Sequence, residues 1–222
     1  YEILIGLVGS EMCIRDRCSS LEYCRAENPL YIAVSQSGAS TNTYELMCAL
    51  RAKGRTVAAL TQYPDSPVGR AAALTVPLPI GEEQIGAKTK GVTATVLTLM
   101  LLALSVCRAP SYRGILYAAM ERLAQSAGEN LSRARQWSRL NQALLLRFRQ
   151  FTVLGGQDGL GAAQEGALKL LETNYLPVSS YPLDEYVHGI QNALDRETCL
   201  LCLLPPEGDD RARMLELILS LI

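Results

Sequence analysis

A short polar segment, SQSGAS, stands between an apolar run and a stretch with helical periodicity. The run LYIAV before it is typical of a buried strand, and TNTYELMCALRAKG after it has apolar residues at helical spacing. In a turn between a strand and a helix, the first backbone N–H groups of the helix have no partner within the helix. The positive end of the helix dipole lies at the same place. The segment therefore predicts a phosphate site, although a ligand-free Ser/Thr-rich cap is the alternative. Its residues are Ser35, Gln36, Ser37, Gly38 and Ser40, and the absence of lysine argues against a Walker-type nucleotide loop.

A second candidate group contains the residue types used for proton transfer. Glu165, Lys169 and Glu172 are spaced i, i+4, i+7, so they share one face of a predicted helix over 160–174. Two carboxylates beside an ammonium group can adjust the pKa of a carboxylate that acts as a general base. They can also form a row of solvent-exposed salt bridges along the helix. His188 is the only histidine, and its ordinary pKa suits proton transfer near neutrality, although a lone histidine can be structural.

The seven cysteines are spaced irregularly, and only Cys199 and Cys202 are close in sequence. They lie in TCLLCLLP, a predicted strand, where positions three apart point to opposite faces. A shared metal or redox pair is therefore not expected, and no metal site is predicted. Free thiols and the lack of a recognisable signal peptide lead us to expect a cytoplasmic location.

Composition excludes several function classes. The chain of 222 residues has a formal net charge of −1 and is 49% hydrophobic, so it gives no support to nucleic-acid or membrane-surface binding. The longest apolar run, Val92–Cys107, falls short of the roughly 20 residues needed to cross a bilayer. We expect it to form a buried helix, with no nucleic-acid or membrane partner.

The first 17 residues read as a translated sequencing adapter. Back-translation of LVGSEMCIRDR, residues 7–17, matches in frame the read-two adapter and transposase end of tagmentation libraries. The flow-cell primer fits Tyr1, Glu2 and the start of Ile3 at the right offset. We therefore expect residues 1–17 to be non-native, and the natural sequence to be truncated before Cys18 and after Ile222.

From Pro29 onward, short apolar runs alternate with helical stretches. Strands are predicted at 30–36, 56–62, 73–80, 151–156, 176–181 and 198–205, with the prolines of 73–80 favouring an edge position. Helices are predicted at 41–54, 88–107, 160–174 and 209–222, and two more are expected between Ser111 and Phe148. This order is typical of an α/β fold with parallel sheets covered on both faces. We expect two tandem three-layer α/β/α units, 18–127 and 128–222.

Three segments, in the same order, resemble the SIS (sugar isomerase) domain family. SQSGAS is similar to its S-Q-S-G-E-T signature. EEQIGAKTKGVTATVLTLMLLAL and GALKLLETNYLPVSSYPLDEYVHGIQNAL resemble two segments of the isomerase half of glutamine–fructose-6-phosphate aminotransferases. Tandem-SIS sugar-phosphate deglycases share the pattern. The resemblance implies two SIS domains, the first incomplete at its start and the second at its end.

The resemblance also implies roles for the candidate residues. Ser35, Gln36, Ser37 and Ser40 would hold the phosphate of a hexose phosphate or its amino or glycated derivative. Glu172 would move a proton between C1 and C2, and His188 would assist ring opening from the neighbouring subunit of a homodimer. The reaction would be isomerisation, deglycation, deamination or amino-sugar synthesis, and it needs no cofactor. A non-catalytic sugar-phosphate sensor of a regulator is the alternative.

The sequence departs from the family pattern at two places. Gly86 and Lys88 replace the family's Val and Ser, which favours an isomerase or deglycase over an aminotransferase. Ile190 and Gln191 follow Gly189 where the family has Pro-Leu. Because part of the phosphate site and a tail lysine would be missing, the 222-residue chain is expected to be inactive.

Overall fold

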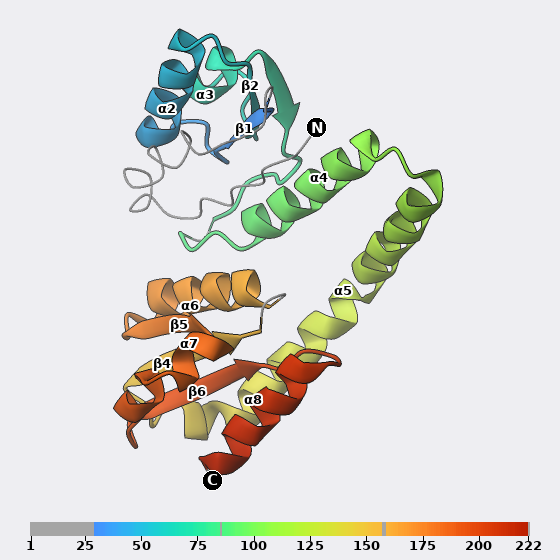
Figure 1. Ribbon diagram of the computed structural model, residues 1–222. Coiled ribbons are helices and arrows are strands. Elements are labelled where there is room, and N and C mark those ends of the chain that lie inside the picture. The colour runs from blue at the N-terminus through green and yellow to red at the C-terminus, as the bar shows by residue number, and fades with distance from the viewer. Residues whose placement is uncertain (1–28, 85, 157–158, 222) are drawn as a thin grey trace. The chain divides into compact units, whose positions relative to one another are not determined.

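The computed structural model describes residues 29–84, 86–156 and 159–221 (Figure 1). The chain divides into two compact units between Glu121 and Arg122, and each unit has its own sheet and core. Residues 1–17, predicted to be translated adapter, lie outside the described residues.

The first unit alternates strands and helices as the sequence predicts. Its elements are β1 (Tyr31–Val34), α2 (Thr41–Ala52), β2 (Val57–Thr61), α3 (Pro67–Ala71), β3 (Leu74–Pro77) and α4 (Lys90–Val106). All three strands are parallel in the order β1-β2-β3, with Ala33 opposite Ala59 and Ala59 opposite Thr75. The proline-containing strand β3 is at an edge of this sheet, as expected, because proline cannot donate to a second neighbour.

Both faces of this sheet are covered because successive side chains of a strand point to opposite sides. Val57 and Ala59 of β2 pack with residues of α2 and α3 on one face, whereas Leu60 packs with Leu99 of α4 on the other. The helix predicted over Val92–Cys107 is α4, and it forms one outer layer of a three-layer α/β/α unit (Figure 1). The expectation that it is buried is only partly correct, because Leu99 and Leu104 are buried whereas Met100 and Val106 are 49% and 59% exposed.

The second unit also alternates strands and helices around a parallel sheet, but its strand order differs from that of the first. Its elements are β4 (Gln150–Gly155), α6 (Leu160–Asn174), β5 (Val178–Pro182), α7 (Leu183–Val187), a 3₁₀ helix (Ile190–Ala193), β6 (Thr198–Leu203) and α8 (Asp209–Ser220). The strands are parallel in the order β5-β4-β6. Val153 of β4 packs against α6, and Leu154 packs against α7 and α8, so helices also cover both faces of this sheet.

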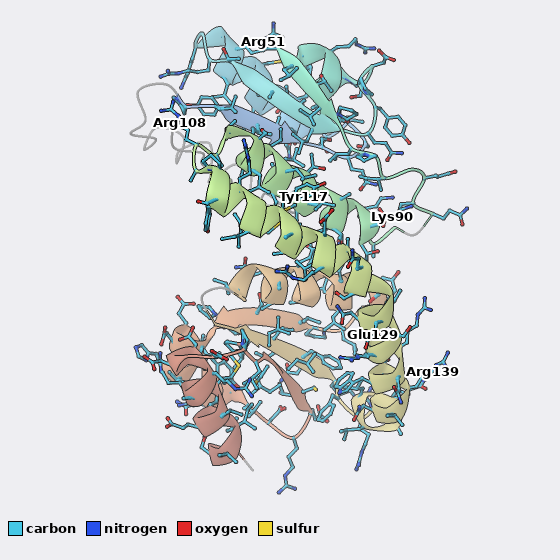
Figure 2. The ribbon with its side chains drawn as sticks, turned by 90° about the vertical axis from the view of Figure 1, so that its right-hand side faces the viewer. Arg51, Lys90, Arg108, Tyr117, Glu129 and Arg139 are labelled. Carbon is cyan, nitrogen blue, oxygen red and sulfur yellow. The ribbon has the colours of Figure 1, made fainter. Side chains whose placement is uncertain are left out.

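The prediction of two helices between Ser111 and Phe148 is wrong. The structure has a single helix, α5, over Pro110–Leu145. A glycine inside a helix costs only about 1 kcal/mol relative to alanine, so Gly128 does not end it. Proline occurs only at the first position of α5, where its missing N–H costs nothing. Figure 2 shows Tyr117, Glu129 and Arg139 spaced along this helix.

Within the described residues, no helix is both long enough and apolar enough to cross a membrane. The apolar helix α4 carries three threonines over Lys90–Val106, and Thr95 is among its buried residues. A buried threonine can donate its hydroxyl to a carbonyl of its own helix, so such residues are tolerated in the core of an α/β unit.

Candidate functional site

The predicted phosphate segment is the turn that joins β1 to α2. Ser35 is buried, and its N–H donates to the Leu60 carbonyl at 3.0 Å, so the segment begins as a continuation of the sheet. Gly38 then turns the chain with a positive φ of 66°, and its N–H donates to the Ser35 carbonyl at 3.1 Å. A β-carbon at Gly38 would lie 1.8 Å from Ser66 Oγ, so both the backbone conformation and the space require glycine.

The hydroxyl groups of the turn are brought together, as the sequence predicts. Ser35 Oγ and Ser40 Oγ lie 3.0 Å apart, and Ser37 Oγ accepts a hydrogen bond from the Ala39 N–H at 3.3 Å. Ser40 is the N-cap residue of α2, but its hydroxyl bonds to Ser35 instead of capping the helix. The turn therefore presents hydroxyls beside the positive end of α2, an arrangement suited to an anion.

Gln36 is held at both its backbone and its side chain. Its carbonyl accepts hydrogen bonds from the Gln62 N–H at 3.0 Å and from Thr61 Oγ1 at 3.3 Å. Its Nε2 donates to Glu83 Oε2 at 3.2 Å. Sequence reasoning missed Thr61, Glu83 and Ser66 as neighbours of this turn. No local signal pointed to Glu83, because it lies seven positions before the start of α4.

Glu83 caps the N-terminus of α4. Its Oε1 accepts from the N–H groups of Thr89 and Lys90, both at 2.8 Å, and its Oε2 accepts from the Gly91 N–H at 3.3 Å. Burial by itself raises the pKa of Glu83, but these backbone hydrogen bonds and the Gln36 side chain outweigh it and lower the pKa to about 2. The carboxylate is therefore ionised throughout the neutral range.

Glu165, Lys169 and Glu172 lie on one face of α6, as their spacing predicts. Lys169 Nζ lies 2.7 Å from Glu172 Oε2 and 3.3 Å from Glu165 Oε1, so the three side chains make one ionic cluster. Burial lowers the pKa of Lys169, but its hydrogen bond to Glu172 and the charges of both carboxylates outweigh this effect and raise the pKa. Glu165 Oε1 is buried and accepts no hydrogen bond within the described residues, although the Lys169 ammonium group lies at ion-pair distance.

His188 is not part of that cluster. It is the C-cap residue of α7, with its backbone N–H donating to the Glu185 carbonyl at 3.2 Å, and its side chain is exposed. Over the residues described, no hydrogen bond joins His188 to Glu172. Both residues lie in the second unit, whereas the Ser35–Ser40 turn lies in the first.

The arrangement of the first unit, a parallel sheet with a hydroxyl-rich turn between its first strand and helix, has a counterpart among known families. Residues 19–105 match the SIS domain family. This stretch contains β1 to α4 up to Ser105, and with them the complete Ser35–Ser40 turn.

Two solved structures and a curated relative extend the SIS likeness over most of the chain. A Clostridium difficile 630 protein, provisionally named a phosphosugar isomerase, is 27% identical with a TM-score of 0.82, covering 90% of this chain and 59% of its own. A Salmonella typhimurium LT2 protein, provisionally named a sugar-binding protein, is 29% identical with a TM-score of 0.77, covering 93% and 67%. The glutamine–fructose-6-phosphate aminotransferase of Streptococcus pyogenes serotype M1 is 28% identical over 81% of this chain. This chain spans 30% of that enzyme's length.

The cysteine prediction concerns the second unit. Leu201 packs with the α6 side of the sheet and Cys202 with the α7–α8 side, so neighbouring β6 side chains alternate between the faces. By the same alternation Cys199 and Cys202 point to opposite faces. Burial raises the pKa of both thiols, and in Cys202 the charge of Cys199 adds to it. In the described part of the chain, no cluster of three or more His, Cys, Asp and Glu side chains could hold a metal ion.

Proposed function

We propose that this chain is part of a sugar-phosphate enzyme that transfers a proton between C1 and C2 of a hexose phosphate or its amino or glycated derivative. The observation that carries the proposal is the Ser35–Ser40 turn, which places hydroxyls at the start of α2 within a match to the SIS domain family. The names of the relatives, which refer to phosphosugars and fructose 6-phosphate, support the same substrate class.

In this proposal the first unit holds the phosphate. The Ser35, Ser37 and Ser40 hydroxyls and the Gln36 side chain donate to phosphate oxygens, and the positive end of α2 stabilises the negative charge. Tight binding of the non-reacting phosphate keeps the reacting carbons in one place. The proposal is consistent with the buried, sheet-anchored position of Ser35.

Glu172 is the proposed general base. It removes a proton from one of the two carbons of the open-chain sugar, leaving an enediolate, or a neutral enolamine where the substrate is a protonated imine, and returns the proton to the other carbon. Lys169, 2.7 Å from Glu172, orients the carboxylate, and Glu165 holds the other side of the ammonium group. His188, supplied by the second subunit of a homodimer, exchanges the proton that opens the sugar ring.

The reaction is proposed to be isomerisation or deglycation. Gly86 and Lys88 stand where the aminotransferase pattern has Val and Ser. The structure has Lys88 Nζ donating to the Glu83 carbonyl at 3.1 Å, so the side chain at this position contacts the segment before α4.

The matched pair Glu172→Gln and Glu129→Gln tests the catalytic assignment in the full-length gene product. Glu129 pairs with Arg133 on an exposed face of α5, so its replacement makes the same charge change away from the cluster. We expect Glu172→Gln and His188→Ala each to lower turnover of the enzyme's sugar phosphate by 10²-fold or more, and Glu129→Gln to leave it unchanged. A loss below tenfold for Glu172→Gln and His188→Ala would overturn the catalytic assignment.

A non-catalytic sensor is the alternative function. It would need the Ser35–Ser40 turn but neither Glu172 nor His188. If the intact protein bound a sugar phosphate but did not convert it, the sensor function would be favoured. Turnover by the 222-residue chain itself would contradict our expectation that it is inactive.

A further inference from the structure

We propose that Glu83 is a positioning residue for the phosphate site, acting through Gln36. Its carboxylate fixes the Gln36 carboxamide against the first turn of α4, so that the amide can donate to the phosphate without first being ordered. The inference rests on the proposed phosphate-binding role of the Ser35–Ser40 turn and adds to it a residue 47 positions away in sequence.

The Gln36 side chain has one well-defined place. Its Nε2 donates to Glu83 Oε2, and its Oε1 lies beside Gly91. A β-carbon added to Gly91 would lie 2.2 Å from Gln36 Oε1 and 2.8 Å from its Cδ. A glycine at this helical position therefore leaves the space that the carboxamide occupies. An amide nitrogen carries two hydrogens, and in the described residues only one of those on Gln36 has a partner.

Glu83 is itself rigidly held, as a residue that positions another must be. Three backbone N–H groups at the start of α4 donate to its carboxylate, from the N-cap residue Thr89 and from Lys90 and Gly91. These donors and the positive end of the helix offset its negative charge, which would otherwise repel a phosphate nearby. With its low pKa, the carboxylate remains an acceptor for Gln36 at any pH near neutrality.

Two lysine side chains also form hydrogen bonds to the segment that contains Glu83. Lys88 Nζ donates to the Glu83 carbonyl at 3.1 Å, and Lys90 Nζ donates to the Glu82 carbonyl at 2.9 Å. Figure 2 shows Lys90 at the start of α4. The two ammonium groups thus anchor residues 82–83 to the helix that Glu83 caps, and the amide of Gln36 is connected to α4 through a fixed carboxylate.

A double-mutant cycle in the full-length protein tests whether Glu83 acts through Gln36. Affinity for fructose 6-phosphate and for inorganic phosphate would be measured by calorimetry in wild type, Glu83→Gln, Gln36→Ala and the double variant. We expect Glu83→Gln to lower affinity about tenfold in the wild-type background, because one ordered donor to a charged group contributes about a tenfold gain in affinity. When Gln36 is already Ala, the same substitution should lower affinity less than twofold. Glu82→Gln is the control, and its affinity should be unchanged. Equal losses in the two backgrounds would overturn the proposal.

Gly91→Ala separates positioning from folding. Alanine favours a helix by about 1 kcal/mol over glycine, so α4 should not be weakened, whereas the added methyl group must displace the Gln36 carboxamide. We expect a similar tenfold loss of affinity in a protein whose melting temperature does not fall. Wild-type affinity in Gly91→Ala would contradict the proposal.

Separate measurements test phosphate binding by the turn and fixation of Gln36 by Glu83. If wild type binds neither fructose 6-phosphate nor phosphate, the phosphate site is wrong. The side-chain amide of Gln36, followed by NMR relaxation, still tests its fixation by Glu83. We expect an ordered amide in wild type and a mobile one in Glu83→Gln, and equal mobility would overturn the positioning role.

Discussion

Replacing Gly38 by alanine tests the geometry of the Ser35–Ser40 turn most directly. Two costs add at this position. An alanine in the left-handed region is strained by about 1–2 kcal/mol, and its β-carbon would lie 1.8 Å from Ser66 Oγ and 2.8 Å from Thr61 Oγ1. Forcing an extra methyl group into a packed site typically costs a further 1–3 kcal/mol. We therefore expect Gly38→Ala to destabilise the first unit by about 2–5 kcal/mol.

Gly54 supplies the matched control. Its φ is 74°, close to the 66° of Gly38, but no heavy atom lies within 4 Å of the position where a β-carbon would be built. Gly54→Ala therefore carries the backbone strain without the collision, and we expect it to cost only about 1–2 kcal/mol. The difference between the two variants isolates the collision with Ser66 and Thr61.

Urea denaturation followed through methionine methyl resonances measures both variants in one experiment. Met47 is buried in the core of the first unit and Met214 in the core of the second. With a slope of about 2 kcal/mol per M, the Met47 midpoint should fall by about 1–2.5 M in Gly38→Ala and by about 0.5–1 M in Gly54→Ala. The Met214 midpoint reports whether the effect is confined to the first unit. The reasoning is refuted if Gly38→Ala lowers the Met47 midpoint no more than Gly54→Ala does.

Three further predictions concern titratable groups. Because the folded pKa of Glu83 is lowered from 4.5 to about 2, its contribution to stability is complete above pH 4.5 and is lost as the pH falls towards 2. Acid unfolding of the first unit should show this loss, and Glu83→Gln should remove it. The pKa of Lys169 is raised above 10.5, so its contribution is complete below that pH and is lost as the pH rises through the folded value. Lys169→Met should lower the stability of the second unit by about 1 kcal/mol at pH 7, measured by urea denaturation, and by less at pH 12. Burial raises the pKa of the Cys199 and Cys202 thiols, so iodoacetamide at pH 7.5 should modify the exposed Cys48 first, as mass spectrometry of timed samples would show. Equal alkylation rates at the three thiols would contradict this order.

Most elements of the fold were predictable because their signals are local. The run over Val57–Thr61 is apolar throughout and forms a strand buried along its whole length. Lys53-Gly54 correctly marked the end of α2, since Gly54 takes the left-handed conformation that follows many helices. The long helix α5 was divided wrongly because a single glycine is a weak signal that a continuous helix tolerates.

The candidate site, like the fold, was predictable where its contacts are local in sequence. The residue types of the Ser35–Ser40 turn and the spacing of Glu165, Lys169 and Glu172 could be read from the sequence, because a turn and a helix face are set by neighbours in the chain. Glu83 could not be identified from the sequence, since its contact with Gln36 arises only when the start of α4 is brought to the end of β1. Its capping role was hidden as well, because the N–H groups it accepts from lie six to eight residues further along the chain.

The sequence by itself determined the order of strands and helices along the chain, the hydroxyl groups of the Ser35–Ser40 turn and the ionic face of α6. Only the tertiary structure decided which groups hold that turn in place. Ser66 and Thr61 fill the space beside Gly38, and Glu83 orients Gln36. These partners are separated from the turn by 23 to 47 positions. The physical reason is that periodicity records which face of its own element a residue occupies, whereas a hydrogen-bond partner depends on how the elements pack.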